Sequence, residues 1–200
     1  MPRKHRTRSL AAACVKLALL ALVLLAAQGA RADDSAMWAL LKKPGQIVLL
    51  RHSNAPGSIP EPYGIDLKNC AIQRSLDDDG RAQARRIGDA FRKHGITRVR
   101  LVSSQFCRAL ETARLTGLGP VAELPALNQV FLADLSGMRE TAEKAAKFMK
   151  TIPAKQLTVL VSHVSNIQSI AGVNLSSGEM AIVHIDAAGA VAVDGRIMVP

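Results

Sequence analysis

Aromatic side chains are scarce in this sequence: tryptophan, tyrosine and phenylalanine together make up 3% of its 200 residues. Proteins that bind single-stranded nucleic acid usually stack bases on aromatic rings, so the scarcity argues against nucleic acid as a partner. The formal net charge of +10 would argue the other way, but residues 1–32 contain six basic side chains and no acidic one. The other residues carry 20 basic against 16 acidic side chains, a net charge of only +4.

The signature motifs of several enzyme classes are also missing. The sequence has no His-Glu-x-x-His zinc motif, no Gly-x-Ser-x-Gly motif of serine hydrolases and no Gly-x-x-x-x-Gly-Lys phosphate loop. It has three cysteines, and the two that follow the N-terminal segment, Cys70 and Cys107, are 37 positions apart, which is a weak spacing for metal ligands. We therefore expect no metal and no other cofactor.

The sequence also lacks an apolar run of the roughly 20 residues that a bilayer-spanning helix needs. Residues 17–27 form an apolar run of eleven residues, which follows a basic start and precedes Ala30-Arg31-Ala32, a small-x-small cleavage site. This pattern predicts a signal peptide over residues 1–32 and a periplasmic or secreted protein. The alternative is a membrane anchor, but Lys16 stops the run from extending toward the N-terminus. We expect cleavage to leave no stable membrane anchor.

Export bears on the two remaining cysteines, because thiols oxidise readily outside the cytoplasm. The even number favours a disulfide between Cys70 and Cys107. In the loop-entropy account such a bridge would stabilise the fold by about 4 kcal/mol. The alternative is that the two cysteines are small buried hydrophobic residues.

We predict that residues 33–200 form a single domain, because the length suits one buried core. The sequence is rich enough in apolar residues for such a core, at 48% hydrophobic. From residue 46 onward, short apolar runs alternate with amphipathic stretches, which is typical of an α/β sandwich on mostly parallel strands.

Residues 53–75 form a long loop rich in proline, glycine, asparagine and serine. Strands are predicted at residues 47–50, 99–102, 121–127, 158–161, 181–185 and 190–193. Helices are predicted from an Asp77–Asp79 cap to Gly95, over 106–116 with Ser104 as the cap, and over 139–150.

Three of the predicted strands end in side chains suited to anion chemistry. Arg51 and His52 follow the first strand, the segment Ser103–Arg108 follows the second, and Ser162 and His163 follow the fourth. Ligands of open α/β sheets bind beyond the carboxyl ends of the strands, so parallel neighbours would bring two arginines and two histidines into one crevice.

This set of side chains matches the chemistry of a phosphate monoester. Bidentate guanidinium groups at Arg51 and Arg108 suit a dianion in geometry and charge, and a helix N-terminus near Arg108 adds to the attraction. A neutral histidine can attack phosphorus and form a phosphohistidine, while the second histidine bonds the other phosphate oxygens in the transition state. His52 and His163 are the candidates.

These residues resemble the histidine phosphatase superfamily, also called phosphoglycerate mutase-like. The resemblance covers residues 46–183 and implies a three-layer α/β/α sandwich that works without metal. It also implies that His52 is the covalent nucleophile and that Arg51, Arg108 and His163 form the phosphate pocket. Its blocks are Leu49-Leu50-Arg51-His52, residues 76–84, residues 103–113, Val161-Ser162-His163 and Ser177-Gly178-Glu179.

The sequence departs from the family at one position next to the nucleophile, which concerns how closely the backbone approaches phosphate, and at the positions that supply the general acid. Ser53 stands where the family usually has glycine, and Val164 stands where some members have an aspartate. The Trp-Glu-Gly context of the glutamate in other members is also missing. We take Asp134 as the candidate general acid, because protonation of the leaving alkoxide contributes about 10²–10⁴-fold to rate. The alternatives are that this carboxylate is solvated or caps a helix, and that one of Glu61, Asp66 and Glu140 acts instead.

The sequence therefore predicts an exported phosphomonoester hydrolase. Residues 33–200, which remain after cleavage, are too few for a large capping domain, so an open site could admit a phosphorylated small molecule or a phosphorylated sugar of an envelope glycan or lipid. The alternative is a phosphate-binding or scaffolding protein that keeps the pocket but lacks a general acid, as Val164 suggests. Arg74, at the end of the long loop, either adds a cation to the pocket or is solvated.

Overall fold

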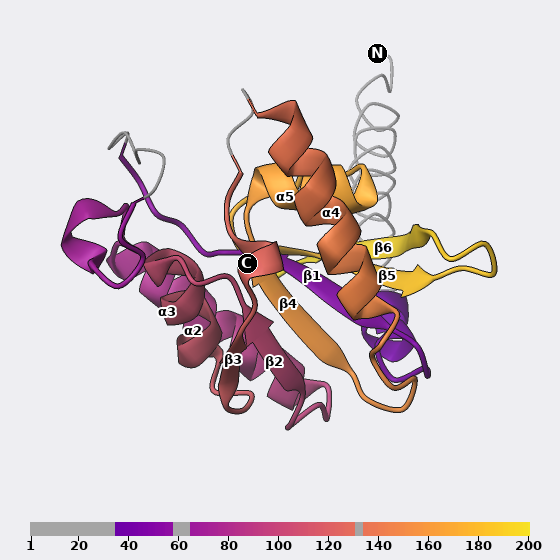
Figure 1. The fold of residues 1–200 in the computed structure, drawn as a ribbon. Helices are drawn as coiled ribbons and strands as arrows, with labels where there is room; N and C mark the ends of the chain where they lie inside the picture. Colours follow the sequence, from indigo (N-terminus) through magenta and orange to yellow (C-terminus); the bar gives the residue numbers. More distant parts are fainter. Residues whose placement is uncertain (1–34, 58–64, 131–133) are drawn as a thin grey trace, which may run out of the picture. The chain divides into compact units, whose positions relative to one another are not determined.

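The computed structural model describes residues 35–57, 65–130 and 134–200 (Figure 1). The chain divides into two compact units, residues 1–39 and 40–200. Of the first unit only a short helical segment from residue 35 is described, and the predicted signal peptide lies outside the described residues. Everything below concerns the second unit.

A six-stranded sheet with the order β3-β2-β4-β1-β5-β6 forms the middle of this unit. Neighbouring strands β3, β2, β4 and β1 run parallel, whereas β5 is antiparallel to both β1 and β6. The α/β fold with a mostly parallel sheet that the sequence predicts is therefore confirmed. The strands are β1 (Ile47–Arg51), β2 (Arg100–Ser103), β3 (Val121–Glu123), β4 (Thr158–Ser162), β5 (Glu179–Ile185) and β6 (Val191–Met198).

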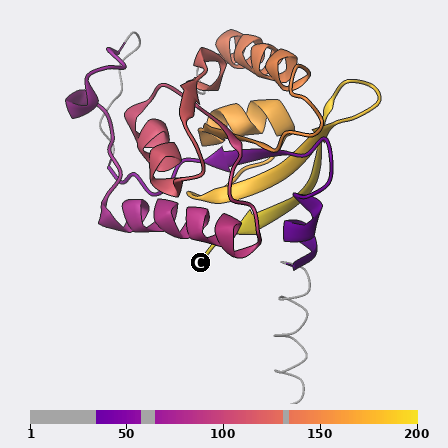
Figure 2. The ribbon, with the colours of Figure 1, turned by 90° about the horizontal axis from the view of Figure 1, so that it is seen from below.

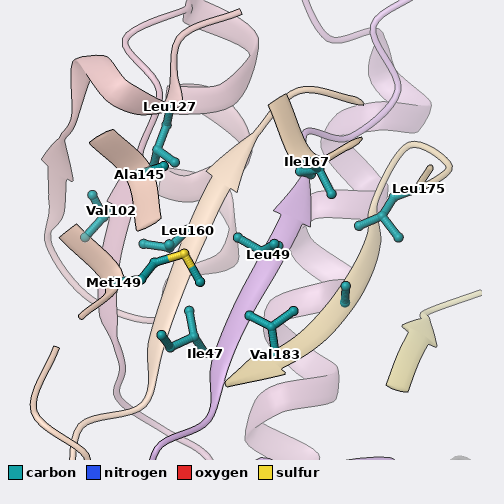
Figure 3. Close-up of a cluster of buried hydrophobic side chains, with 11 residues drawn as sticks. Ile47, Leu49, Val102, Leu127, Ala145, Met149, Leu160, Ile167, Leu175 and Val183 are labelled. Atoms are coloured by element: carbon teal, nitrogen blue, oxygen red, sulfur yellow. The ribbon is translucent and has the colours of Figure 1, made fainter. Parts of the chain in front are cut away.

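The central strands are apolar on both faces because helices cover the sheet on both sides. Ile47 and Leu49 of β1 belong to a buried cluster with Leu160 of β4 and Met149 of helix α4 (Leu135–Met149) (Figure 3). The alternate residues of β1, such as Leu50, are also fully buried and point to the opposite face. Two cores, one on each face, therefore hold β1 and β4 in the middle of the sheet.

Among the described residues, four helices of eight residues or more make up the outer layers: α2 (Asp78–Lys93), α3 (Cys107–Thr116), α4 (Leu135–Met149) and α5 (Val164–Ala171). Figure 2 shows α4 and α5 on one side of the sheet and α2 on the other. Two short 3-10 helices, Cys70–Ile72 and Pro125–Leu127, lie between the larger elements. In the part of the chain that the structure describes, no helix has the length and apolar character needed to cross a membrane.

Several predicted boundaries change in the structure. The strand expected at residues 121–127 ends at Glu123, because Pro125 cannot donate to a sheet ladder and starts a 3-10 helix instead. The helix expected at residues 139–150 begins four residues earlier, at Leu135. Helix α5, directly after His163, is not predicted by the sequence analysis at all. The helix capped by Asp77 is confirmed, since its side chain accepts the Gly80 N–H at 2.7 Å.

Candidate active site

Three strand ends meet at the carboxyl edge of the sheet, as the sequence predicts. Arg51 is the last residue of β1 and stands level with Ser162 of β4, and the His52 N–H bonds to the Ser162 carbonyl at 3.0 Å. The Ser104 N–H, directly after β2, bonds to the Val161 carbonyl at 2.9 Å. Because β2, β4 and β1 are parallel neighbours, their polar continuations lie side by side.

The rings of His52 and His163 face each other, with their centroids 5.2 Å apart. Nδ1 of His52 lies 2.8 Å from the Ser53 carbonyl oxygen. A carbonyl oxygen can only accept, so this nitrogen carries the proton. Nε2 of the neutral ring then has a free lone pair, and Nε of Arg108 donates to it at 3.3 Å. The backbone turn after β1 thus selects the tautomer whose unprotonated nitrogen faces the arginine.

Arg108 is fully buried in the first turn of α3, where a charged side chain needs specific partners. Besides its contact with His52, it donates to the amide oxygen of Gln129, and its guanidinium stacks on the Phe106 ring at 4.9 Å. Gln129 is neutral, so this contact orients the guanidinium without cancelling its charge. Gln129 belongs to no recognisable sequence motif, so its position at the site could not be predicted from the sequence.

A hydroxyl network positions the second histidine. Nε2 of His163 lies 2.8 Å from the Ser104 hydroxyl, which also lies 3.2 Å from the Asn128 side-chain oxygen. If the hydroxyl donates to that oxygen, it accepts from Nε2–H of His163, and Nδ1 is left as the unprotonated nitrogen. Nδ1 is buried and has no hydrogen-bond partner among the described residues.

Ser104 does not cap α3, contrary to the sequence prediction. The helix begins at Cys107, and its N-cap residue is Phe106, whose side chain makes no capping bond. The Ser104 hydroxyl accepts the Phe106 N–H at 3.2 Å, which supports the turn before the helix. A serine between a strand and a helical stretch predicts a helix N-cap, but the side chain of Ser104 orients His163 instead.

Two further arginines contribute positive charge. Arg51 donates to the Leu175 carbonyl at 2.8 Å, while its buried Nε has no partner among the residues that the structure describes. The Arg74 guanidinium donates to the Ala55 carbonyl at 3.2 Å. Burial is the main cause that lowers the pKa of Arg51, His52 and His163, and the charge of Arg74 acts in the same direction on all three, so Arg74 lies close enough to influence the site. From the sequence, Arg74 could either add a cation to the pocket or be solvated.

Both histidines are neutral at ordinary pH. Burial, followed by the charge of Arg108, lowers the pKa of His52 to about 3. Burial also lowers the pKa of His163 well below its usual range, and the neighbouring His52 and Arg108 act in the same direction. A neutral imidazole is the form that can attack phosphorus.

Cys70 and Cys107 lie with their sulfur atoms 2.01 Å apart, which is the distance of a disulfide. The link joins the 3-10 helix of the long loop to the first residue of α3, next to Arg108. The side chain of Gln73 also connects the loop with α3. Its oxygen accepts the Cys107 N–H at 2.9 Å, and its nitrogen donates to the Leu67 carbonyl at 3.1 Å. Arg74 follows Gln73 directly, so the same contacts position the loop arginine.

Asp134 is the N-cap residue of α4. Its carboxylate accepts the Gly137 N–H at 2.8 Å and the Ser136 hydroxyl at 3.0 Å. The general-acid role predicted for it stays a prediction. Of the competing carboxylates, Asp66 accepts the Lys68 N–H, Glu140 pairs with Lys144, and Glu61 lies outside the described residues.

No group of three or more histidine, cysteine, aspartate or glutamate side chains within residues 35–57, 65–130 and 134–200 is arranged to hold a metal ion. The cations gather around two neutral imidazoles, one of which has an unprotonated nitrogen facing a guanidinium. The fold and the site therefore define an α/β protein in which two neutral histidines and three arginines lie together at the carboxyl edge of the sheet.

The chain belongs to the histidine phosphatase superfamily (branch 1), whose family model matches residues 47–157. No curated protein sequence matches the chain. Among solved structures, the protein histidine phosphatase SixA complexed with tungstate is 16% identical, with a TM-score of 0.54 over 76% of this chain and 96% of that one. A putative α-ribazole-5′-phosphate phosphatase from Escherichia coli is 18% identical, with a TM-score of 0.58 over 75% and 94%. A mycobacterial glucosyl-3-phosphoglycerate phosphatase is 16% identical, with a TM-score of 0.55 over 74% and 96%. At these identities the likeness shows the fold alone.

Proposed function

We propose that the protein is a phosphomonoester hydrolase that forms a phosphohistidine on Nε2 of His52. One observation carries the proposal. The Ser53 carbonyl accepts from Nδ1 at 2.8 Å, so the lone pair is on Nε2, where it accepts from Nε of Arg108 at 3.3 Å and would be released for attack when the guanidinium turns to the phosphate oxygens. The proposed nucleophile and a cation that could bind phosphate are therefore direct neighbours in the site.

The reaction proceeds in two displacements. In the first, Nε2 of His52 attacks phosphorus, the phosphorus–oxygen bond to the alcohol breaks, and the leaving alkoxide takes a proton. In the second, water attacks the phosphohistidine and gives up a proton to the carboxylate that protonated the leaving group, the phosphorus–nitrogen bond breaks to restore neutral His52, and inorganic phosphate leaves. Arg51, Arg108 and Arg74 neutralise the phosphate oxygens. His163 is neutral in the free site, so it first takes a proton at Nδ1 from the bound phosphate monoanion, whose negative charge raises the pKa of the imidazole, and then donates that proton in a hydrogen bond to a phosphate oxygen.

Catalysis is tested by hydrolysis of p-nitrophenyl phosphate in the presence of EDTA. The wild-type protein should turn over without added metal, and His52→Ala should abolish turnover and the acid-labile phosphoryl label. His184→Ala is the matched control, because His184 pairs with Asp194 on β5 and β6, away from the site. Full activity in His52→Ala would refute the assignment of the nucleophile.

For the leaving-group proton we propose Asp134. Asparagine is as good an N-cap as aspartate but cannot act as an acid, so Asp134→Asn separates the two roles of this side chain. The variant should keep the wild-type melting temperature, lose much of its activity on an alkyl phosphate, and retain most of its activity on p-nitrophenyl phosphate, whose leaving group needs no proton. Equal losses on both substrates would rule out Asp134 as the general acid.

The alternative function is a phosphate-binding or scaffolding protein without turnover. Val164, where some family members carry an aspartate, is the feature that favours it. Such a protein would bind tungstate or phosphate but hydrolyse no aryl phosphate, and His52→Ala would change only its affinity.

We propose further that the enzyme is exported and acts on a phosphorylated sugar or another envelope component. The basic and apolar leader supports export, as does a pair of cysteines at disulfide distance, because such bonds persist outside the cytoplasm. The names of two structural neighbours, an α-ribazole-5′-phosphate phosphatase and a glucosyl-3-phosphoglycerate phosphatase, support a phosphorylated sugar. N-terminal sequencing of exported protein should begin at Asp33, and a chain that keeps residues 1–32 would contradict cleavage.

A further inference from the structure

The edge of the sheet opposite the active site contains two adjoining cavities with a basic lining. One, of about 690 Å³, lies at the amino ends of β2, β3 and β4, and the other has about 410 Å³. Both are lined by Arg98 and Lys155, the larger also by Arg100, and the smaller also by Lys42 and Lys43. No aspartate or glutamate is among the lining residues of either cavity. We call these five cations the basic edge.

Backbone hydrogen bonds hold the loops that form these cavities. The Gly45 N–H bonds to the Ala154 carbonyl at 2.7 Å and connects the segment before β1 with the loop before β4. The Arg100 N–H bonds to the Leu157 carbonyl at 2.9 Å, which connects that same loop with the start of β2. The cavities are therefore part of the fold, and a ligand there would meet preformed walls.

The cations of the basic edge are not neutralised by the protein. Lys42, Lys43, Arg98 and Lys155 are exposed, and none of them forms an ion pair with a described residue. Arg100 stacks on the Phe148 ring, with its guanidinium carbon 5.0 Å from the ring centroid. Elsewhere on the described surface four basic side chains are paired with acidic ones: Arg81 with Asp78 and Glu111, Arg92 with Asp89, Lys144 with Glu140, and Arg196 with Glu179. Other exposed cations, such as Lys68, Arg85, Arg139 and Lys147, also form no ion pair with a described residue but line neither of the two cavities. What sets the basic edge apart is that its cations gather around shared cavities without an acidic lining residue.

We propose that the basic edge docks the protein on a membrane surface that carries anionic phosphate headgroups. The proposal rests on the export proposed above, which brings the chain to a membrane, and Lys42 and Lys43 follow the predicted leader by ten residues. The cavity linings contain no aromatic ring on which nucleic-acid bases could stack. They also contain none of the large hydrophobic side chains that the described surface exposes, so the attachment would be electrostatic and sensitive to salt.

Docking by this edge would leave the active site accessible. The basic edge lies at the amino ends of the parallel strands, and the histidines lie at their carboxyl ends. The length of β1 separates the two by roughly 16 Å, at the usual rise of a strand. The pocket would open away from the surface, toward soluble phosphate esters or phosphorylated sugars that extend from the membrane. Hydrolysis of soluble p-nitrophenyl phosphate should therefore continue while the protein is bound.

The test is co-sedimentation of the mature chain with vesicles of phosphatidylcholine, with and without phosphatidylglycerol, at low salt. The protein should sediment only with the anionic vesicles, because each basic residue near such a surface strengthens binding about fivefold. Replacing Lys42, Lys43, Arg98 and Lys155 with glutamine should weaken binding at least about tenfold. The matched control replaces Lys68, Arg85, Arg139 and Lys147, which lie outside both cavities, with glutamine, and its affinity should stay near the wild-type value.

Three outcomes would overturn the proposal. The first is wild-type protein that does not sediment with anionic vesicles, and the second is equal loss in the two quadruple variants, which would mean that only net charge matters. The third is displacement from the vesicles by millimolar glycerol phosphate, which would assign the cavities to soluble phosphate esters. Hydrolysis of p-nitrophenyl phosphate is measured in a separate assay. A protein without phosphatase activity would contradict the proposed function but would not affect the sedimentation result.

Discussion

His52 is a neutral imidazole whose pKa of about 3 results mainly from burial and then from the charge of Arg108. In the unfolded chain the same ring titrates near its ordinary pKa of 6.5. Between these values only the unfolded chain binds the extra proton, so the contribution to stability is complete above pH 6.5 and is lost as the pH falls toward 3. His163, whose pKa is lowered too, acts in the same direction.

We therefore expect the free energy of unfolding to fall by roughly 2 kcal/mol or more between pH 7 and pH 5. Urea unfolding at the two pH values measures this difference. His52→Gln should reduce the pH dependence, because glutamine does not titrate, whereas His184→Gln should retain it. Identical pH dependence in wild type and His52→Gln would show that the burial of His52 does not govern acid stability.

Ser104 is a positioning residue for His163. Ser104→Ala leaves Nε2 of His163 without its partner at 2.8 Å. A buried donor without a partner costs about 1–3 kcal/mol. We expect kcat for p-nitrophenyl phosphate to fall roughly tenfold to a hundredfold, with a changed pH profile, because the tautomer is no longer selected. Ser103→Ala is the control, since the equally buried Ser103 hydroxyl donates only to the Ser104 carbonyl. Equal effects of the two variants would indicate a general packing defect.

The contact between α2 and α3 depends on one glycine. A Cβ atom on Gly88 would lie 1.9 Å from the Thr116 carbonyl oxygen at the end of α3, far inside contact distance. Alanine is a better helix former than glycine by about 1 kcal/mol, but here the steric clash outweighs this gain, so the substitution should destabilise the protein. Gly88→Ala should lower the free energy of unfolding by about 1–3 kcal/mol in urea denaturation. Arg85→Ala, on the exposed face of the same helix, should change it by less than about 0.5 kcal/mol.

Helix α2 is predictable from sequence because its cap, its charged first turn and its apolar spacing all agree. Helix α5 is harder to predict, since its eight residues directly follow a strand and carry serine and asparagine in a stretch without a capping side chain. The third strand is shorter than predicted because Pro125 interrupts an otherwise apolar run. Elements with several independent local signals are therefore predictable, and those that depend on tertiary packing are not.

At the scale of the whole molecule, the link between Cys70 and Cys107 closes the loop that follows His52. In the loop-entropy account, Cys70→Ser/Cys107→Ser should lower the free energy of unfolding by about 4 kcal/mol. It should also raise KM for p-nitrophenyl phosphate more than it lowers kcat, because the loop carries Arg74 to the pocket while Ser53 still orients His52. Non-reducing mass mapping of the exported protein checks the premise, and two free thiols there would contradict it.

The order of residues along the chain was enough to determine the alternation of strands and helices, the positions of Arg51, His52, Arg108 and His163 at strand ends, and the family that these blocks resemble. Local propensity and hydrophobic period carry that information. The tertiary structure alone decided that Ser53 and Ser104 select the tautomers of the histidines, that Gln129 contacts Arg108, and that five cations from three separate segments of the chain line one edge of the sheet. Apart from the contact of His52 with its neighbour Ser53, which depends on the local backbone turn, these relations join residues distant in sequence, and side-chain hydrogen bonds and electrostatic potentials depend on distance in space.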